Sequence, residues 1–234
     1  MHKYPYRKPE NNLLTRIFVK RWTKFWMRFG GYGKGGRLAY RLAALFVPPY
    51  KERIRLSGMN KKGFVEHTAS IHHPQMFLGD NCFIGDRVVL YERRGGGAIT
   101  FGNRVEINRD TLIETGIGGF IKIGDHSSIH PGGILFAYIE PIIIGAGVMI
   151  ASNCCLYSYD HAVAPHDSIR NQAPVSKGPI VIGDEAWLAA GCVVMSGVSI
   201  GNGAVIGAGS IVTHDIPENA IAAGVPARVF KMRN

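Results

Sequence analysis

His161 is the residue of this sequence best suited to moving a proton. It lies in the segment YSYDHAVAPHDSIRNQAPVSKGP, which runs from Tyr157 to Pro179. A neutral imidazole is the usual general base for removing the proton of a hydroxyl group near neutral pH. Asp160 precedes it, but adjacent residues of an extended chain point to opposite sides, so a backbone carbonyl or a carboxylate from elsewhere could orient the ring equally well. The residues therefore indicate a candidate general base and leave its orienting group open.

Four histidines offer a second kind of chemistry. Three imidazoles and a water molecule make a catalytic zinc site, and ligands from two subunits could complete one. The candidates are His126, His130, His161 and His166. No other feature of the chain supports metal binding, so we expect the protein to need no metal.

Sequence motifs for other chemistries are weak or missing. The segment GYGKGG at 31–36 matches G-x-G-x-x-G, but it follows a basic aromatic segment rather than a strand and lacks an acidic ribose partner. A flexible loop is the better interpretation of it. The sequence has no G-x-S-x-G and no Walker A motif, so covalent hydrolase chemistry and nucleoside triphosphate chemistry are not expected.

An aliphatic residue at every sixth position indicates the element that must carry the histidine segment. The pattern is clearest in IGDEAWLAAGCVVMSGVSIGNGAVIGAGSIVT, residues 182–213, and can be followed back to Leu78. Six is a multiple of the strand period of two, so these residues share one face, and a small or β-branched residue follows nearly all of them after four positions. The pattern is typical of a β-solenoid with three hexapeptides per coil. The aliphatic positions of this stretch are Ile182, Leu188, Val194, Ile200, Ile206 and Val212.

The repeat predicts an all-β solenoid domain at 63–216, followed by a C-terminal tail at 217–234. Six coils are expected between residues 78 and 216, with a stacked height of roughly 30 Å. Residues 157–179 interrupt the repeat as an extended loop, and a long loop on a rigid scaffold is where function concentrates. The general rule for parallel crossovers favours a right-handed coil, so the residues alone predict that hand.

The first 62 residues form a strongly basic arm. They hold 16 Lys and Arg against two acids, whereas the rest of the chain holds 11 against 15. Apolar and aromatic residues recur at helical spacing over about 12–29, opposite a stripe of basic residues, which predicts an amphipathic helix. Such a helix can lie on an anionic membrane surface, or it can pack its aromatic face on the open end of the solenoid. The sequence leaves both possibilities open.

The positions of the cysteines and the lengths of the apolar runs indicate the cellular compartment of the protein. Cys82, Cys154 and Cys192 fall in small inward positions of the repeat, which fits buried thiols in a reducing cytoplasm rather than a disulfide framework. The longest clean apolar run, LAALFV at 42–47, is far shorter than the ~20 residues that a membrane span requires, and no cleavable signal peptide is recognisable. We expect a cytoplasmic protein that binds no nucleic acid. If the basic arm contacts a membrane, we expect that contact to be peripheral and at the inner membrane face.

These features together resemble a known family. The repeat, the looped-out histidine of SYDHAV and the closing run that ends in AAGVPARVF are similar to the left-handed β-helix acyltransferases. The resemblance is greatest to bacterial sugar O-acetyltransferases such as galactoside and maltose acetyltransferase, and to enzymes that decorate surface glycans. It is specific over residues 144–231, general over 78–143, and does not cover the basic arm.

The resemblance implies a left-handed β-helix that assembles as a homotrimer and binds acetyl-CoA in the groove between adjacent coils. His161 is then the general base for direct transfer of the acetyl group to a sugar hydroxyl in surface glycan biosynthesis, without a covalent acyl-enzyme. Transfer to the amine of a nucleotide-linked amino sugar is the second hypothesis. A non-catalytic solenoid scaffold is the third, and it gives no reason for the long loop.

The resemblance also assigns further residues. His130 falls near an asparagine that lines the acceptor pocket of the sugar enzymes, and Tyr159 and Asp160 are further acceptor candidates. His214 stands where a lysine is common, so one phosphate contact is weaker or replaced. The other residues expected to contact acetyl-CoA line the path of its pantetheine and adenine or meet its phosphates: Trp187, Ala190, Ala208, Thr213, Arg228 and Lys231.

Overall fold

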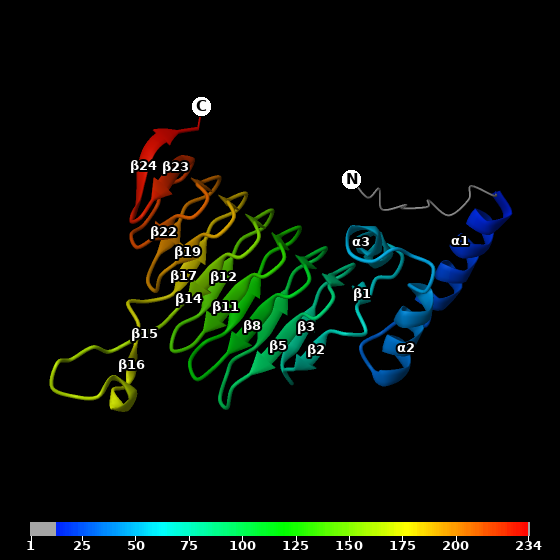
Figure 1. Ribbon diagram of the computed structural model, residues 1–234, viewed down its shortest axis with the longest axis horizontal. Coiled ribbons are helices and arrows are strands. Elements are labelled where there is room, and N and C mark those ends of the chain that lie inside the picture. The colour runs from blue at the N-terminus through cyan, green and yellow to red at the C-terminus, as the bar shows by residue number, and fades with distance from the viewer. Residues whose placement is uncertain (1–12, 234) are drawn as a thin grey trace, which may run out of the picture.

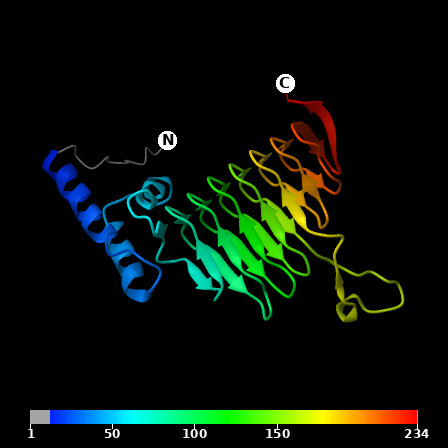
Figure 2. The same ribbon diagram turned by 180° about the vertical axis from the view of Figure 1, so that it is seen from behind.

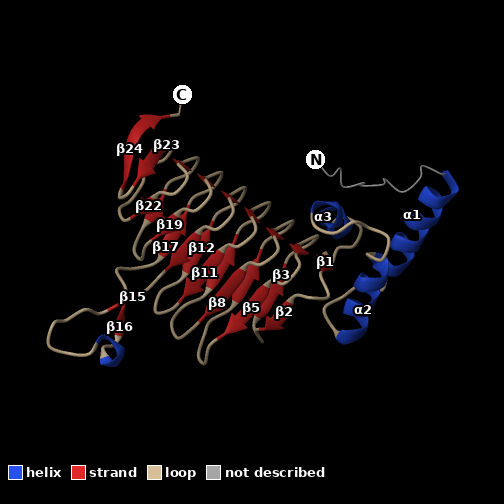
Figure 3. Cartoon of the chain, viewed as in Figure 1, coloured by secondary structure: helices blue, strands red, loops and turns tan. Residues whose placement is uncertain are grey.

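The chain folds as a left-handed parallel β-helix of about seven turns. The structure, a computed structural model, describes residues 13–233 (Figure 1). Each coil contributes short strands to three parallel sheets, so the stacked coils form a three-sided prism. The α-helices lie at its N-terminal end, and a short 3₁₀ helix, η1 (Ile169–Asn171), lies in the projecting loop (Figure 3). The hand is the one that the resemblance implies, and the right hand predicted from the general crossover rule is wrong.

The strands of successive coils stack in register along the three faces. The first face contains β1 (Phe64–Val65), β4 (Phe83–Ile84), β7 (Glu106–Ile107), β10 (Ser128–Ile129), β13 (Met149–Ile150), β18 (Trp187–Leu188), β21 (Val205–Ile206), β23 (Ala220–Gly224) and β24 (Ala227–Met232). The second face contains β2 (Ser70–His72), β5 (Val89–Glu92), β8 (Leu112–Thr115), β11 (Ile134–Ala137), β14 (Cys155–Tyr157), β19 (Val193–Val194) and β22 (Ile211–Val212). The third face contains β3 (Met76–Leu78), β6 (Ile99–Phe101), β9 (Ile121–Ile123), β12 (Ile142–Ile144), β17 (Ile180–Ile182) and β20 (Ser199–Ile200).

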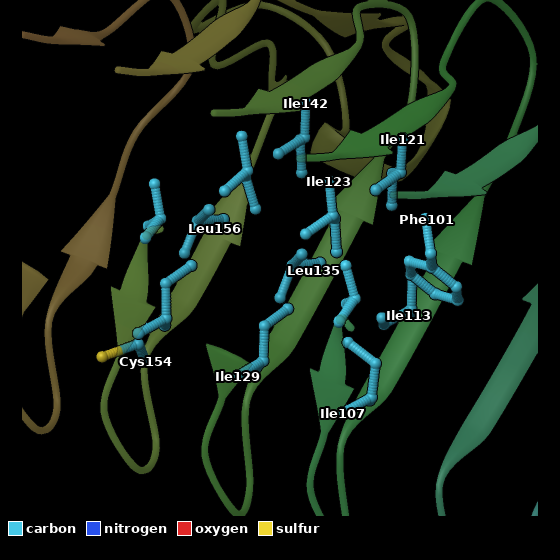
Figure 4. Packing of buried hydrophobic residues seen from close by; sticks show 14 of the residues in the cluster. Phe101, Ile107, Ile113, Ile121, Ile123, Ile129, Leu135, Ile142, Cys154 and Leu156 are labelled. Carbon is cyan, nitrogen blue, oxygen red and sulfur yellow. The ribbon is translucent and has the colours of Figure 1, made fainter. Parts of the chain in front are cut away.

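The aliphatic residue of each hexapeptide points into the prism, as the repeat predicts (Figure 4). Small polar residues are accepted beside this core because backbone carbonyls satisfy them. The Ser127 hydroxyl donates to Gly145 O at 2.8 Å, and the Thr111 hydroxyl donates to Asn108 O at 2.7 Å. The buried column under the second face consists of Leu90, Ile113, Leu135, Leu156, Val194 and Val212.

The solenoid begins earlier than the six-residue phase predicts. The strands β1, β2 and β3 form a complete coil before the first predicted one, and Val65 pairs with Ile84 while Ile71 pairs with Leu90. Six residues separate Val65 from Ile71, but seven separate Ile71 from Leu78. The predicted domain boundary at 63 includes this coil, although the six predicted coils are counted only from residue 78.

Two helices close the N-terminal end of the prism. They are α2 (Lys34–Ala43) and α3 (Lys51–Ser57). The Tyr40 ring of α2 lies 5.2 Å from the Phe64 ring of the first coil, and Arg53 of α3 donates to both carboxylate oxygens of Glu66 at 2.8 and 3.0 Å. The open end is thereby covered, as exposed strand edges require.

The helix α1 (Leu13–Met27) packs on α2 and not on the solenoid. The Thr23 hydroxyl donates to Ala43 O at 3.2 Å, and the Trp22 indole donates to Leu42 O at 2.7 Å. The predicted helix over 12–29 is therefore observed at 13–27, and residue 12 lies outside the described residues. Figures 1 and 2 show α1 beyond the end of the prism.

The glycine-rich segment at 31–36 is not the loop that its composition predicts, because α2 begins at Lys34 within it. A Cβ atom at Gly36 would lie 2.5 Å from the backbone nitrogen of Gly31. Glycine is therefore needed here for a close backbone crossing between α1 and α2.

A β-hairpin covers the other end of the solenoid. Strand β23 pairs in parallel with β21, and β24 then pairs antiparallel with β23, which extends the first face by two strands. The predicted C-terminal tail is thus a structured hairpin over most of its length.

Candidate active site

His161 lies on a short two-stranded stem that projects from the solenoid. The chain leaves the second face after β14, and β15 (Asp160–His161) pairs antiparallel with β16 (Pro174–Val175) before the chain returns to β17. In this stem His161 is opposite Pro174. Figure 1 shows the stem and its loop standing away from the edge of the prism near its C-terminal half.

Ser196 ties both limbs of this stem to the next coil. Its hydroxyl donates to Asp160 Oδ2 at 2.7 Å, and it accepts the backbone N–H of Lys177 at 3.4 Å. Ser196 is 3% exposed and lies in the corner between β19 and β20. The outgoing and returning limbs are therefore held by one buried hydroxyl group.

A second pair of hydroxyl groups closes the root of the loop. The fully buried Ser158 donates to Glu140 O at 2.6 Å and accepts the N–H of Tyr138 at 3.0 Å. Ser176 on the returning limb donates to Ser158 O at 2.7 Å. At the tip, the Gln172 side chain exchanges hydrogen bonds of 2.8 and 3.0 Å with the backbone of Ala164. The loop is thus internally bonded from its root to its tip.

The imidazole of His161 is exposed and faces an aromatic neighbour. Its ring lies 6.3 Å from the Tyr159 ring, which in turn lies 5.3 Å from that of Tyr138. Among the described residues, no side chain or backbone group is hydrogen-bonded to the imidazole. The Asp160 carboxylate binds Ser196 instead, so it fixes the stem rather than the ring.

His130 lies at a different corner of the prism from His161. It follows β10, between the first and second faces, whereas the loop leaves between the second and third. The width of the second face therefore separates the two histidines within one chain. Beside His130, burial raises the pKa of Glu106, and the imidazole opposes that shift. Within residues 13–233, no three His, Cys, Asp or Glu side chains are grouped closely enough to hold a metal ion.

Three of the expected cofactor residues, Trp187, Ala190 and Ala208, lie on the last coils. Trp187 points outward from the first face between Met149 and Val205. Ala190 and Ala208 occupy the same corner of consecutive coils, where Gly209 N donates to Ala190 O at 2.8 Å. Both alanines are exposed, and a Cβ atom at Gly209 would meet no atom within 4 Å. This corner presents accessible backbone with almost no side chain over it.

The remaining expected cofactor residues flank that surface. Arg228 and Lys231 are exposed on β24, at the end of the first face that also carries Trp187. Thr213 and His214 lie at the corner after β22, where the Thr213 hydroxyl and His214 Nδ1 are 2.9 Å apart. The structure thus places the cofactor candidates and the His161 stem on the same C-terminal half of the solenoid.

An aliphatic stripe runs along the outside of the second face. Its members are neighbours in consecutive coils, and all of them are half-buried. Contiguous apolar surface of this kind usually marks a site of protein association. The residues of this outer stripe are Val89, Leu112, Ile134, Cys155, Val193 and Ile211.

The hexapeptide repeat predicts neither Ser196 nor the outer stripe. It constrains the inward positions, whereas Ser196 lies two positions after the inward Val194, where the repeat allows any residue. For the stripe, the sequence does hold a signal, because each of its apolar residues directly precedes an inward one.

Comparison with known proteins agrees with the fold. A family profile described as bacterial transferase hexapeptide (six repeats) matches residues 179–214. The N-acyltransferase AntD from Bacillus cereus, solved in complex with dTDP and 3-hydroxybutyryl-CoA, superposes with a TM-score of 0.56 at 22% identity, covering 74% of this chain and 81% of AntD. At this identity the likeness concerns the fold.

Two relatives from Escherichia coli strain K12 are closer in sequence. The putative lipopolysaccharide biosynthesis O-acetyl transferase WbbJ is 32% identical over 148 residues, which is 60% of this chain and 75% of WbbJ. Galactoside O-acetyltransferase is 41% identical over 115 residues, which is 46% of this chain and 56% of that enzyme. The chain therefore spans little more than half the length of the galactoside enzyme. In the part that the structure describes, no helix is both long and apolar enough to cross a membrane.

Proposed function

This chain belongs to the hexapeptide-repeat acyltransferases, and on that premise we propose that it transfers the acetyl group of acetyl-CoA to a hydroxyl group of a sugar in a surface glycan. The observation that carries the proposal is His161, which is exposed on an anchored stem and has no hydrogen-bond partner among the described residues. The names of the two relatives, one acting on galactosides and one assigned to lipopolysaccharide biosynthesis, support a sugar as acceptor.

The proposed reaction is a direct transfer. His161 takes the proton of the sugar hydroxyl while its oxygen attacks the thioester carbonyl, and backbone N–H groups stabilise the oxyanion. The tetrahedral intermediate then expels the thiolate of CoA, which receives the proton from His161. The sugar leaves as an acetyl ester. The aromatic surface of Tyr159 and Tyr138 beside the imidazole is suited to contact a sugar ring, so we assign Tyr159 to the acceptor side.

Acetyl-CoA would bind along the last coils. The uncovered backbone at Ala190 and Ala208 allows the amides of pantetheine to approach main-chain donors and acceptors, which a larger side chain would prevent. Trp187 offers a flat surface on the adjoining face, and Arg228 and Lys231 supply positive charge for the phosphates. Thr213 and His214 are hydrogen-bonded to one another at the neighbouring corner, and we assign both to the edge of the cofactor path.

A homotrimer accounts for two features of the structure. The outer stripe would be buried between subunits, and the His130 corner of one subunit would come to face the loop of its neighbour. Within one chain the second face keeps His130 away from His161, so any role of His130 at the acceptor requires that assembly. We place the enzyme in the cytoplasm, because its four cysteines are unpaired.

The test is acetyl-CoA titration by calorimetry, followed by thiol release with sugars, nucleotide-linked amino sugars and lipid-linked glycans as acceptors. We expect thiol release with a sugar hydroxyl and its loss by about 100-fold or more in His161→Ala, because a positioned general base contributes at least that factor. His166→Ala is the matched control, since His166 is also exposed on the loop. Release only with amino sugars would replace O-transfer by N-transfer, and absence of CoA binding would refute the proposal.

A further inference from the structure

Six aromatic rings from α1 and from the turns that follow α1 and α2 form one connected cluster. We call this cluster the aromatic ridge. Successive ring centroids lie 5.3 to 6.0 Å apart, mostly edge to face, so the rings form one surface rather than scattered contacts. The ridge consists of Phe18, Trp22, Phe25, Trp26, Phe29 and Phe46.

The ridge remains exposed after the helices have packed. Phe18, Phe25 and Phe29 are 53%, 50% and 59% exposed, and a shallow groove runs beside them between Ile17 and Arg21. A soluble monomer rarely leaves such a contiguous aromatic surface in water. The surface is therefore built to be covered.

Of the ridge, only the half-buried Trp22 and Trp26 also take part in packing the helices, whereas Phe18, Phe25 and Phe29 stay exposed. The opposite side of α1 is anchored through buried Met27 and Thr23, and Asn60 donates to Met27 O at 2.7 Å. Tyr40 of α2 closes the end of the prism. The helices α2 and α3 close the end of the prism, and of the aromatic face of α1 only Trp26 packs against the buried core.

The charge around the ridge indicates its partner. Residues 13–49 contain eight Lys and Arg and no Asp or Glu. Arg21 and Lys24 of α1 and Arg28 in the turn after it are interspersed in sequence with the ridge residues, are exposed, and form no ion pair among the described residues. An apolar aromatic surface bordered by unpaired positive charge is complementary to a bilayer with anionic head groups. A second copy of this surface would repel it.

We propose that α1 lies in the interface of an anionic membrane, with the aromatic ridge in the boundary between head groups and acyl chains. Arg21, Lys24 and Arg28 then contact the anionic head groups. This proposal adds a lipid surface as a partner to the proposed function. It rests on that function in one respect only, namely that the sugar acceptor is then carried on a lipid.

The test is cosedimentation of the full chain with vesicles of phosphatidylcholine, with and without phosphatidylglycerol. We expect binding only to the anionic vesicles and its weakening at high salt. The variant R21Q/K24Q/R28Q should lower the partition coefficient on the order of 100-fold, because each basic residue near an anionic surface contributes roughly fivefold. Lys122→Gln is the charge control, because Lys122 is exposed on the third face.

The ridge itself is tested by F25S/F29S, which should lower partition by at least about tenfold. Phe77→Ser is its control, since Phe77 is an exposed aromatic residue on β3. In a Trp187→Phe background, lipids brominated in the acyl chain should quench the remaining indoles. Equal binding of F25S/F29S and the parent, equal binding to neutral vesicles, or a changed oligomeric state without lipid binding would each overturn the proposal.

The two proposals can fail separately. Thiol release with a soluble sugar is measured on R21Q/K24Q/R28Q and on F25S/F29S, both with Trp187 retained, and should not change, because the ridge lies beyond the N-terminal end of the solenoid, away from the His161 stem (Figure 1). Vesicle binding without any thiol release would refute acetyl transfer and leave the membrane surface standing. Thiol release without vesicle binding would refute the membrane proposal and leave acetyl transfer standing.

Discussion

The Ser196 hydroxyl should be needed for turnover although it touches no reacting atom. Ser196→Ala removes the donor to Asp160 Oδ2 and the acceptor of Lys177 N–H, the two contacts that join the stem of His161 to the neighbouring coil. A hydrogen bond to a charged group contributes about 1.5–3 kcal/mol. Asp160 is only half-buried, so water can solvate its carboxylate in the variant, and the lower limit applies. That energy corresponds to about a tenfold fall in the equilibrium ratio of ordered to released stem, which sets the size of the largest loss of turnover expected.

We therefore expect kcat to fall about tenfold in Ser196→Ala, while the Kd of acetyl-CoA and the thermal midpoint stay close to those of the parent. The Kd is preserved because the cofactor candidates lie on other corners. Asp160→Asn keeps an oxygen that can accept from Ser196 and should lose less activity than Asp160→Ala. Ser199→Ala is the matched control, because that serine is exposed on β20.

The assay is thiol release at saturating acetyl-CoA across pH, together with the rate of tryptic cleavage at Arg170 in the loop. A positioning role predicts a lower kcat, faster cleavage and an unchanged Kd of acetyl-CoA. Parent-like turnover in a folded Ser196→Ala protein would refute the reasoning. So would an equal loss of cofactor binding and thermal stability, because this would indicate a general defect of the coil.

Three further variants examine other parts of the structure. Ile134→Glu should convert the homotrimer to monomers in analytical ultracentrifugation, because it places a charge in the middle of the outer stripe, and a persistent trimer would mean that another surface associates. R228Q/K231Q should raise the Kd of acetyl-CoA about tenfold at low salt, with the difference shrinking as salt rises; a salt-independent effect would argue against phosphate contacts. Burial raises the pKa of Glu106 in the folded state, so ionisation of this carboxyl lowers the free energy of unfolding. The loss of stability is absent below the pKa of the unfolded state and grows as pH rises through the pKa of the folded state. Glu106→Gln should therefore raise the thermal midpoint at pH 8 and leave it unchanged at pH 4.

The inward face of the solenoid could be predicted because burial imposes a strict periodicity on it. Residues such as Leu135 and Leu156 repeat at fixed spacing since each must fill the same place in the prism. The six predicted coils leave out the first coil, although the predicted domain boundary at 63 includes it. Handedness could not be obtained from the periodicity, which is the same for either hand.

The candidate site was predictable only in part. His161 was found by its residue type within a long insertion, because a loop interrupting a tight repeat stands out. Ser196 was not found, since its partner Asp160 is 36 residues away and neither position is constrained by the repeat. The direction of the aromatic ridge also depended on tertiary packing, because helical spacing shows that α1 has an apolar face but not which neighbour covers it.

The solenoid between the arm and the loop can be regarded as a spacer of fixed length. The arm packs on the coil of β1, and the His161 stem leaves the coil of β13 and β14, four strand spacings along the first face. At strand separation these four steps span about 19 Å along the axis. If the ridge rests on a bilayer, the base is held at a set height above it. The enzyme would then choose which sugar unit of a membrane-attached chain to modify by its distance from the lipid, and inserting or deleting one coil would move the modified position along the chain.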